Sequence, residues 1–300
     1  MVSFIDAHRG QYGVEPMCRE LPIAPSSQYY AHKAREADPI CLPPRLQRDR
    51  ILVPEIQRIH EENFGVYGAR KVWRQLGRED IIAARCTVER LMRSLGLQGA
   101  VRGRTRRTTR ADERFERPLD RVNRQFLANR PNALWVADFT YVATWSGFVY
   151  VAFVIDVFAQ RIIGWCVTRS MHAELVLDAL EQAVWSRSDI EGVVHHSDRG
   201  SQYLSIRYSE RLAEVGAQPS VGSVSDSYDN ALAETIIGLY KTEVIHQRGP
   251  WRNLDAVEYA TLGWVDWFNN RRLLEPIGNI PPAEFEASYD QSTGQLPMAA

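Results

Sequence analysis

The pattern of hydrophobic and polar positions is irregular over the first 44 residues. A short amphipathic stretch built on Val2, Phe4 and Ile5 is followed by a series of prolines. Proline in the interior of a helix removes a backbone hydrogen bond and clashes with the preceding turn. We therefore predict that residues 1–44 form small helices joined by linkers.

Helical spacing is clear in the next segment, residues 45–102. Hydrophobic residues recur three or four positions apart in three stretches. The first stretch ends before Gly65, and the second covers about residues 69–76. The third begins at Thr87, a residue type favoured as an N-cap, and ends at Gly96. This segment predicts a small all-α domain.

The spacing changes to that of β-strands further along the chain. Segments rich in β-branched and aromatic residues follow one another at residues 135–142, 148–156 and 161–167. The dipeptide Ser146-Gly147 supplies a hairpin turn between the first two. These segments predict three consecutive antiparallel strands.

Helices and strands alternate in the rest of the chain. Short apolar strands are expected at residues 192–195 and 218–221. The predicted helices cover residues 173–185, 206–215, 228–245 and 254–273. The resulting order is typical of an α/β fold in which helices cover both faces of a mixed five-stranded sheet. We place this core at residues 131–290 and a tail at residues 291–300.

Composition limits the class of protein. Of the 300 residues, 45% are hydrophobic, which is typical of a globular protein. The longest apolar run, near residues 148–155, is too short for a membrane helix, and the first residues lack an export signal. We therefore expect a cytoplasmic protein without a membrane partner. The four cysteines are too scattered for a zinc module, so any metal must be held by oxygen.

The net charge of −1 conceals two oppositely charged parts. Residues 45–130 contain 21 lysines and arginines against 11 acidic residues. Residues 131–300 contain 11 lysines and arginines against 21 acidic residues. The basic part suits phosphates, and the acidic part suits cations.

Arginines gather on the third predicted helix and after it. Arg85, Arg90 and Arg93 lie on or beside this helix, as in a helix-turn-helix that lays one helix into a DNA groove. An ordinary solvated helical bundle explains the three helices equally well. The linker at residues 103–130 favours DNA, because its arginines suit phosphate contacts. These arginines include Arg104, Arg106 and Arg107.

Three carboxylates stand out in the predicted core. Asp138 lies within an otherwise apolar strand, where an unpaired charge is costly. Asp198 follows the strand at residues 192–195, and ligand sites in α/β sheets gather at strand ends. Glu234 lies on the helix at residues 228–245. A salt bridge, a capping turn and a solvated helix face are the respective structural alternatives.

The helix that carries Glu234 offers further polar groups. Asn230 precedes Glu234 by four positions and Lys241 follows it by seven, so the three side chains lie near one face. His196 and Arg199 flank the second acid. These neighbours of the carboxylates are the candidate DNA contacts of the core.

Acidic residues from two strands and a helix can hold two Mg²⁺ or Mn²⁺ ions, which prefer oxygen ligands. Such a pair activates an attacking oxygen and stabilises a leaving oxygen in phosphoryl transfer. Asp138 would bridge both ions, while Asp198 and Glu234 would each complete one. Asp138 should pair near Phe153, which places Asp156 about 10 Å along the sheet. We interpret Asp156 as structural.

Three motifs resemble those of a known family. WVADFTY, HHSDRGSQY and SYDNALAE contain the three acids in order, with 35 residues between the second and third acids. They resemble the acidic motifs of the second-reading-frame transposases of the IS3 family of bacterial insertion sequences, within the DDE integrase group. The resemblance covers nearly the whole chain, including YGAR in the helix-turn-helix and WFNNRR near the end.

The resemblance implies a ribonuclease-H-like core that performs metal-dependent DNA 3′-end cleavage and strand transfer. Its partners would be the terminal inverted repeats, the target DNA and the product of the upstream reading frame, with which such enzymes are often fused by frameshifting. We expect self-association on DNA, because two ends must be cut, and a location at the bacterial nucleoid. A DNA-binding regulator that occupies the ends without cutting is the alternative, and the intact acids argue against it.

Overall fold

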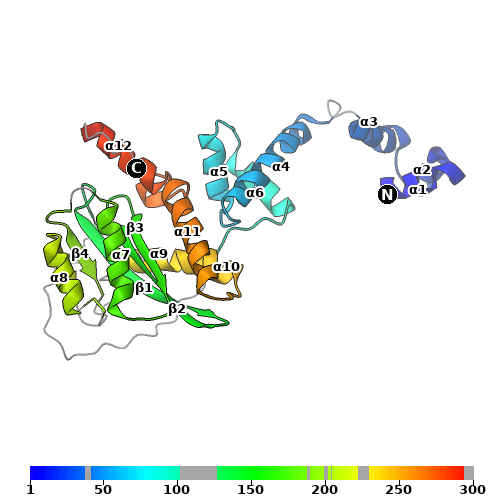
Figure 1. Cartoon of the computed structure of the whole chain (residues 1–300). Coiled ribbons are helices and arrows are strands. Elements are labelled where there is room, and N and C mark those ends of the chain that lie inside the picture. The colour runs from blue at the N-terminus through cyan, green and yellow to red at the C-terminus, as the bar shows by residue number, and fades with distance from the viewer. Residues whose placement is uncertain are drawn as a thin grey trace.

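The structure is a computed structural model, in which a helical N-terminal part leads to a sheet covered by helices (Figure 1). It describes residues 1–37, 42–101, 127–187, 190–198, 202–203, 205–221 and 230–293. The predicted basic linker, with Arg104, Arg106 and Arg107, therefore lies almost wholly outside the described residues, as does the tail after residue 293.

Small helices fill the first segment, as its prolines predict. They are α1 (Val2–Tyr12), α2 (Val14–Glu20), the π-helix η1 (Pro25–Tyr30) and α3 (Ala31–Ala37). Their apolar side chains, among them Ile5 and Tyr29, form a separate small cluster. The Tyr29 hydroxyl donates to Asp6 at 2.8 Å, and Lys33 donates to the same carboxylate at 2.8 Å. These contacts tie the N-terminal helix to the later ones.

Three helices form the next unit, as predicted. They are α4 (Pro44–Glu62), α5 (Ala69–Arg78) and α6 (Arg85–Ser94). α4 begins earlier than its isoleucine pattern indicates, because Pro43 and Pro44 occupy the N-cap and first turn, where a missing N–H costs nothing. The prediction that Thr87 caps the third helix is wrong, since Ala84 is the N-cap and Thr87 lies inside α6.

Five strands form one mixed sheet in the order β3-β2-β1-β4-β5. The strands are β1 (Leu134–Thr144), β2 (Gly147–Asp156), β3 (Arg161–Thr168), β4 (Val194–Ser197) and β5 (Gln218–Val221). The first three are antiparallel, whereas β4 runs parallel to β1 and β5 parallel to β4. Asp138 pairs with Phe153, as predicted, although the hairpin loop is Trp145-Ser146, one position earlier than expected.

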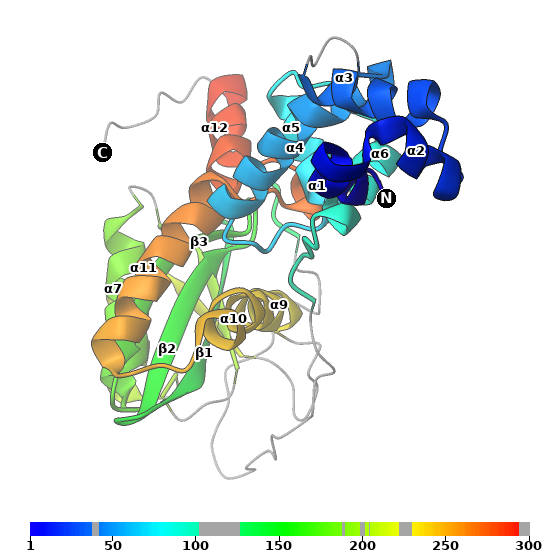
Figure 2. The same cartoon turned by 90° about the vertical axis from the view of Figure 1, so that its right-hand side faces the viewer.

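Helices cover both faces of the sheet, which confirms the predicted α/β class (Figure 2). Alternate residues of β1 face opposite sides. Trp135 packs in the cluster of α7 and α8, and Val136 packs in the cluster of α9 and α11. The helices of the core are α7 (Ala173–Trp185), α8 (Ile206–Glu214), α9 (Ala231–Tyr240), the π-helix η3 (Lys241–Ile245), α10 (His246–Arg248), α11 (Leu254–Asn270), the 3₁₀ helix η4 (Glu275–Ile277) and α12 (Pro282–Thr293). Within the described ranges, no helix is long and apolar enough to cross a membrane.

The three-helix unit shares a hydrophobic core with the α9 and α11 side of the sheet. Tyr67 is fully buried between the two, where its hydroxyl donates to the Arg271 carbonyl at 3.3 Å and accepts from the Leu273 amide at 2.8 Å. The Trp267 indole donates to the Asn63 side chain at 2.9 Å. These contacts join the unit to the end of α11 through packing as well as through the chain.

A buried ion pair lies at this junction. Arg272 donates to the Glu243 carboxylate from two nitrogens, and both side chains are about 95% buried. The Trp264 indole donates to the same carboxylate at 3.1 Å. A buried carboxylate that keeps its charge needs such partners, because the protein interior solvates ions poorly.

The Arg272→Met variant is expected to lower the free energy of unfolding by about 3–5 kcal/mol, because it leaves the Glu243 charge buried and unpaired. The matched control is Arg271→Met, which removes an exposed pair with Glu62 and is expected to cost at most about 1 kcal/mol. Urea unfolding of both variants measures the difference. Equal losses of unfolding free energy in the two variants would show that the buried pair contributes no more to stability than the exposed one.

Candidate active site

Two of the predicted acids lie side by side, just beyond the last paired residues of β1 and β4. Asp138 is on β1, and Asp198 directly follows the last residue of β4. The last pair between these parallel strands is Ala137 with Ser197. Asp198 therefore stands one residue beyond the paired region, beside Asp138 on the neighbouring strand. Asp138 is half-buried and Asp198 is exposed.

The third acid comes from the helix that packs on β1. Glu234 is exposed in the first turn of α9. Burial and the charges of Asp198 and Glu234 raise the pKa of Asp138 well above its usual range. The Phe139 amide, which donates to Asp138 at 2.8 Å, and the charge of Lys241 offset part of this effect. The fold thus brings the three carboxylates and one ammonium group close enough to interact.

The ligand atoms available here are carboxylate oxygens, the type that Mg²⁺ and Mn²⁺ prefer. Within the described ranges, no three His, Cys, Asp or Glu side chains converge closely enough to hold one metal ion together. Two ions that share Asp138 would each need only two of the three carboxylates. A cation would also relieve the repulsion that raises the pKa of Asp138. The donor set therefore fits divalent cations chemically.

Tyr203 forms an apolar wall next to the two aspartates. Its ring packs against Phe139 and Tyr208, with centroids 6.1 and 5.5 Å away. Burial and the charges of Asp138 and Asp198 raise the pKa of Tyr203. Its buried hydroxyl has no hydrogen-bond partner among the described residues. The sequence motif contains this tyrosine, but nothing in the pattern indicated that its hydroxyl is buried within reach of the charges of both acids.

Lys241 lies at the start of η3, one helix after Glu234. Its ammonium group sits 5.3 Å from the centroid of the Tyr141 ring. Burial lowers the pKa of Lys241, while the Asp138 carboxylate acts in the opposite direction. A half-buried cation beside the acids is suited to a phosphate that enters the site.

Two predicted DNA contacts of the core are buried. His196 is 1% exposed, and its Nδ1 lies 3.0 Å from the Ser220 hydroxyl on β5. Asn230 is 6% exposed and donates to the backbone of β1. Neither side chain reaches the surface where DNA would bind. Arg199 lies outside the described residues.

The predicted arginines of α6 differ in their surroundings. Arg93 is exposed near the end of the helix. Arg85 pairs with Glu89 on the same helix at 3.0 Å. Arg90 pairs with Asp49 of α4 at 2.6 Å, a contact that fixes the packing of α6 on α4. Arg93 is therefore the clearest candidate for a phosphate contact among the three.

Asp156 has the structural role that its position predicted. It pairs with Trp135, three residues along β1 from Asp138. Its carboxylate accepts from the amides of Asn132 at 2.9 Å and Phe158 at 3.0 Å and lies 3.5 Å from Arg187. These bonds hold the chain where it enters β1 and leaves β2.

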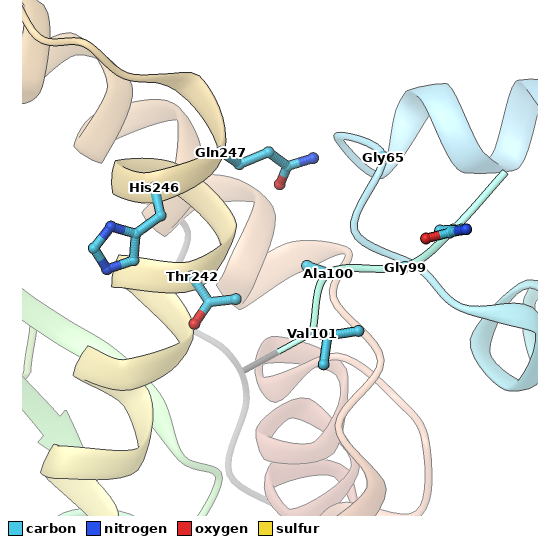
Figure 3. A pocket seen from close by; sticks show the side chains of 8 residues that line it. Gly65, Gly99, Ala100, Val101, Thr242, His246 and Gln247 are labelled. Atoms are coloured by element: carbon cyan, nitrogen blue, oxygen red, sulfur yellow. The ribbon is translucent and has the colours of Figure 1, made fainter. Parts of the chain in front are cut away.

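A hollow of about 450 Å³ lies at the seam between the three-helix unit and η3 (Figure 3). Gln247 extends from α10 toward Gly65, and its amide donates to the Phe64 carbonyl at 3.2 Å. Gly99 lets the chain after α6 fold back here, since a Cβ at this position would lie 2.4 Å from the Gly68 nitrogen. The hollow borders Thr242, the residue after Lys241.

Family models match the three-helix unit and the core separately. An "Integrase core domain" model matches residues 128–227, a second model of that description matches residues 215–282, and an "HTH-like domain" model matches residues 47–105. A solved structure, the HTLV-2 integrase catalytic core domain in complex with magnesium, is 15% identical, covers 53% of this chain and 98% of its own, and has a TM-score of 0.43.

Curated relatives are similar over the whole length. The "Transposase for insertion sequence element IS629" of Shigella sonnei is 57% identical over 300 residues, 100% of both chains. The "Putative transposase for insertion sequence element IS986/IS6110" of Mycobacterium tuberculosis (strain ATCC 25618 / H37Rv) is 58% identical over 275 residues, 90% of this chain and 96% of the relative. Together with the mixed five-stranded sheet, these matches confirm the expected integrase-type α/β core. The chain therefore belongs to the IS3 family of insertion-sequence transposases, which are DDE-type polynucleotidyl transferases.

Proposed function

We propose that Asp138, Asp198 and Glu234 are the metal-binding catalytic residues with which this transposase cuts DNA 3′ ends and transfers the strands. The observation that carries the proposal is the pairing of Ala137 with Ser197, which places Asp198 beside Asp138. Besides burial, the charges of Asp198 and Glu234 both contribute to the raised pKa of Asp138. Like charges gathered at a strand end destabilise a protein unless they serve a ligand of opposite charge.

Two divalent cations held by these residues would activate the attacking oxygen and stabilise the leaving oxygen. The charges of both other acids act on Asp138. Asp138 is therefore the carboxylate best suited to be shared by two cations. Asp198 and Glu234 are exposed, so a ligand from solvent can reach them. Lys241 supplies a positive charge for a DNA phosphate next to the acids.

The remaining parts have roles that follow from their charge. The helix-turn-helix at residues 45–102 would hold the terminal inverted repeats, and the basic linker at residues 103–130 would follow the DNA backbone to the core at residues 131–290. Residues 1–44 would be a separate N-terminal segment. The upstream-frame product and a second copy of the chain, assembled on DNA, would complete the transposition complex.

The activity to be measured is the formation of DNA circles from the insertion sequence. The Glu234→Gln variant is expected to reduce it by more than about 100-fold, because loss of even a residue that only orients a metal ligand costs about 10–100-fold. The assay uses a plasmid that carries the intact element with its upstream reading frame. The matched control, Glu258→Gln, changes an exposed glutamate on α11 and should keep full activity. A fully active Glu234→Gln protein would contradict the assignment.

The Asp138→Asn variant is expected to raise the melting temperature of the metal-free protein near pH 7. The folded protein raises the pKa of Asp138, so ionisation costs stability as pH rises from the unfolded value, about 4, to the folded value. Asparagine removes this cost and still accepts from the Phe139 amide. Thermal unfolding in chelator measures the gain, which should vanish below about pH 4.

The control for this measurement is Asp178→Asn, an exposed position on α7 where the melting temperature should hardly change. Equal melting temperatures for wild type and Asp138→Asn at pH 7 would show that ionisation of Asp138 carries no cost in the folded protein.

The Arg93→Ala variant is expected to weaken DNA binding at low salt and to reduce the slope of log affinity against log salt by about 1, because one phosphate contact is lost. Fluorescence anisotropy with duplex DNA measures both. Arg211→Ala is the control, since Arg211 pairs with Glu181 and Glu214 on the far side of the sheet from α9. Unchanged binding by Arg93→Ala would remove α6 from the DNA interface.

A further inference from the structure

Asn230 connects the elements that carry the three acids. It is the N-cap residue of α9, and its backbone carbonyl accepts from the Glu234 amide at 3.0 Å. Its side-chain Nδ2 donates to the Ala137 carbonyl on β1 at 2.9 Å. The bond ends on the peptide that joins Ala137 to Asp138. One short side chain thus links the start of the Glu234 helix to the backbone of Asp138.

The hydrogen bond from Asn230 lies at the point where β1 stops pairing with β4. Ala137 is the last residue of β1 that pairs with β4, and its partner Ser197 precedes Asp198. A buried backbone carbonyl needs a hydrogen-bond partner, and at this position the Asn230 amide is one. Asn230 therefore contacts the point at which the two aspartate-bearing strands part.

We propose that Asn230 is a positioning residue that sets the separation between Glu234 and the two aspartates, and thereby the affinity for divalent cations. The inference rests on the proposed function of the three acids. It replaces the expectation that Asn230 contacts DNA, because a side chain that is 6% exposed and bonded to β1 offers DNA no donor.

A second observation supports a role beyond packing. The Oδ1 atom of Asn230 is buried and has no hydrogen-bond partner among the described residues. A buried acceptor without a partner costs stability, and an apolar residue of similar size would avoid that cost. Proteins retain such costs mainly at functional sites.

The chain contains a matched control. Asn269 on α11 also ties a helix to a strand backbone, since its side chain donates to the Ile162 carbonyl at 2.8 Å and accepts from the Ile162 amide at 2.9 Å. It is 9% exposed, and the strand that it binds, β3, is at the far edge of the sheet from β4. Asn230→Leu and Asn269→Leu remove the same kind of bond from two places.

The test is thermal unfolding of the full-length protein without DNA, as a function of Mn²⁺ concentration. Binding of Mn²⁺ to the folded state raises the melting temperature by mass action. We expect Asn230→Leu to need at least about tenfold more Mn²⁺ than wild type for the same shift, as for other residues that orient metal ligands. Asn269→Leu should lower the melting temperature at zero Mn²⁺ but keep the wild-type Mn²⁺ dependence. Asn230→Ser, which keeps a favoured N-cap residue, serves if the leucine variant does not fold.

Two outcomes would overturn the inference. If Asn230→Leu and Asn230→Ser keep the wild-type Mn²⁺ dependence, Asn230 only stabilises the fold. If they lose binding to duplex DNA in chelator while Asn269→Leu retains it, Asn230 is a DNA contact after all. Asp138→Asn separates this from failure of the proposed function: a normal Mn²⁺ response of Asp138→Asn would refute the metal site itself.

Discussion

Repulsion among three carboxylates is the constraint that the core of this protein must withstand. Asp138 is half-buried, and its burial together with the charges of Asp198 and Glu234 raises its pKa. Apolar packing supplies the opposing stabilisation. Phe153, the cross-strand partner of Asp138, stacks edge-on against Tyr240 of α9 at 5.2 Å, and Tyr240 in turn packs on Trp264 of α11 at 5.2 Å. These aromatic contacts hold α9 against the sheet despite the charges at its first turn.

The two aspartates of the β1–β2 hairpin show how position decides the role of a residue type. Asp156 lies three residues along the sheet, where two backbone amides and Arg187 bind its carboxylate. Asp138 has one backbone amide and two acidic neighbours. The surroundings of Asp156 stabilise the fold. At Asp138 the like charges repel one another, and a bound cation would reduce that repulsion.

The junction between the three-helix unit and the core has a consequence for DNA. Tyr67 connects the unit to the end of α11. The buried Glu243–Arg272 pair connects that end to η3, the π-helix that also carries Lys241. The three-helix unit proposed to bind the DNA ends is therefore packed, through Tyr67, against the part of the core that is tied to η3 and Lys241. Such a connection restricts the orientation in which bound DNA can approach the core.

The sequence by itself determined the order of the elements, and it singled out three acids whose charges interact in the folded chain. Alternation of β-branched residues located β1, β2 and β3, and a short hairpin loop set the pairing of Asp138 with Phe153. These features depend on residues near one another in the chain, and so local pattern predicts them. The separation of Asp138 from Asp156 along one strand follows from the same geometry.

Only the tertiary structure decided which polar side chains are buried and with what partners. His196 and Asn230 stand in a polar motif and on a polar helix face, yet β5 and β1 cover them. Arg272 is next to the exposed Arg271 in sequence, but it alone turns inward to Glu243. Burial depends on elements that are distant in sequence, and no local pattern specifies which of two adjacent polar residues they will enclose.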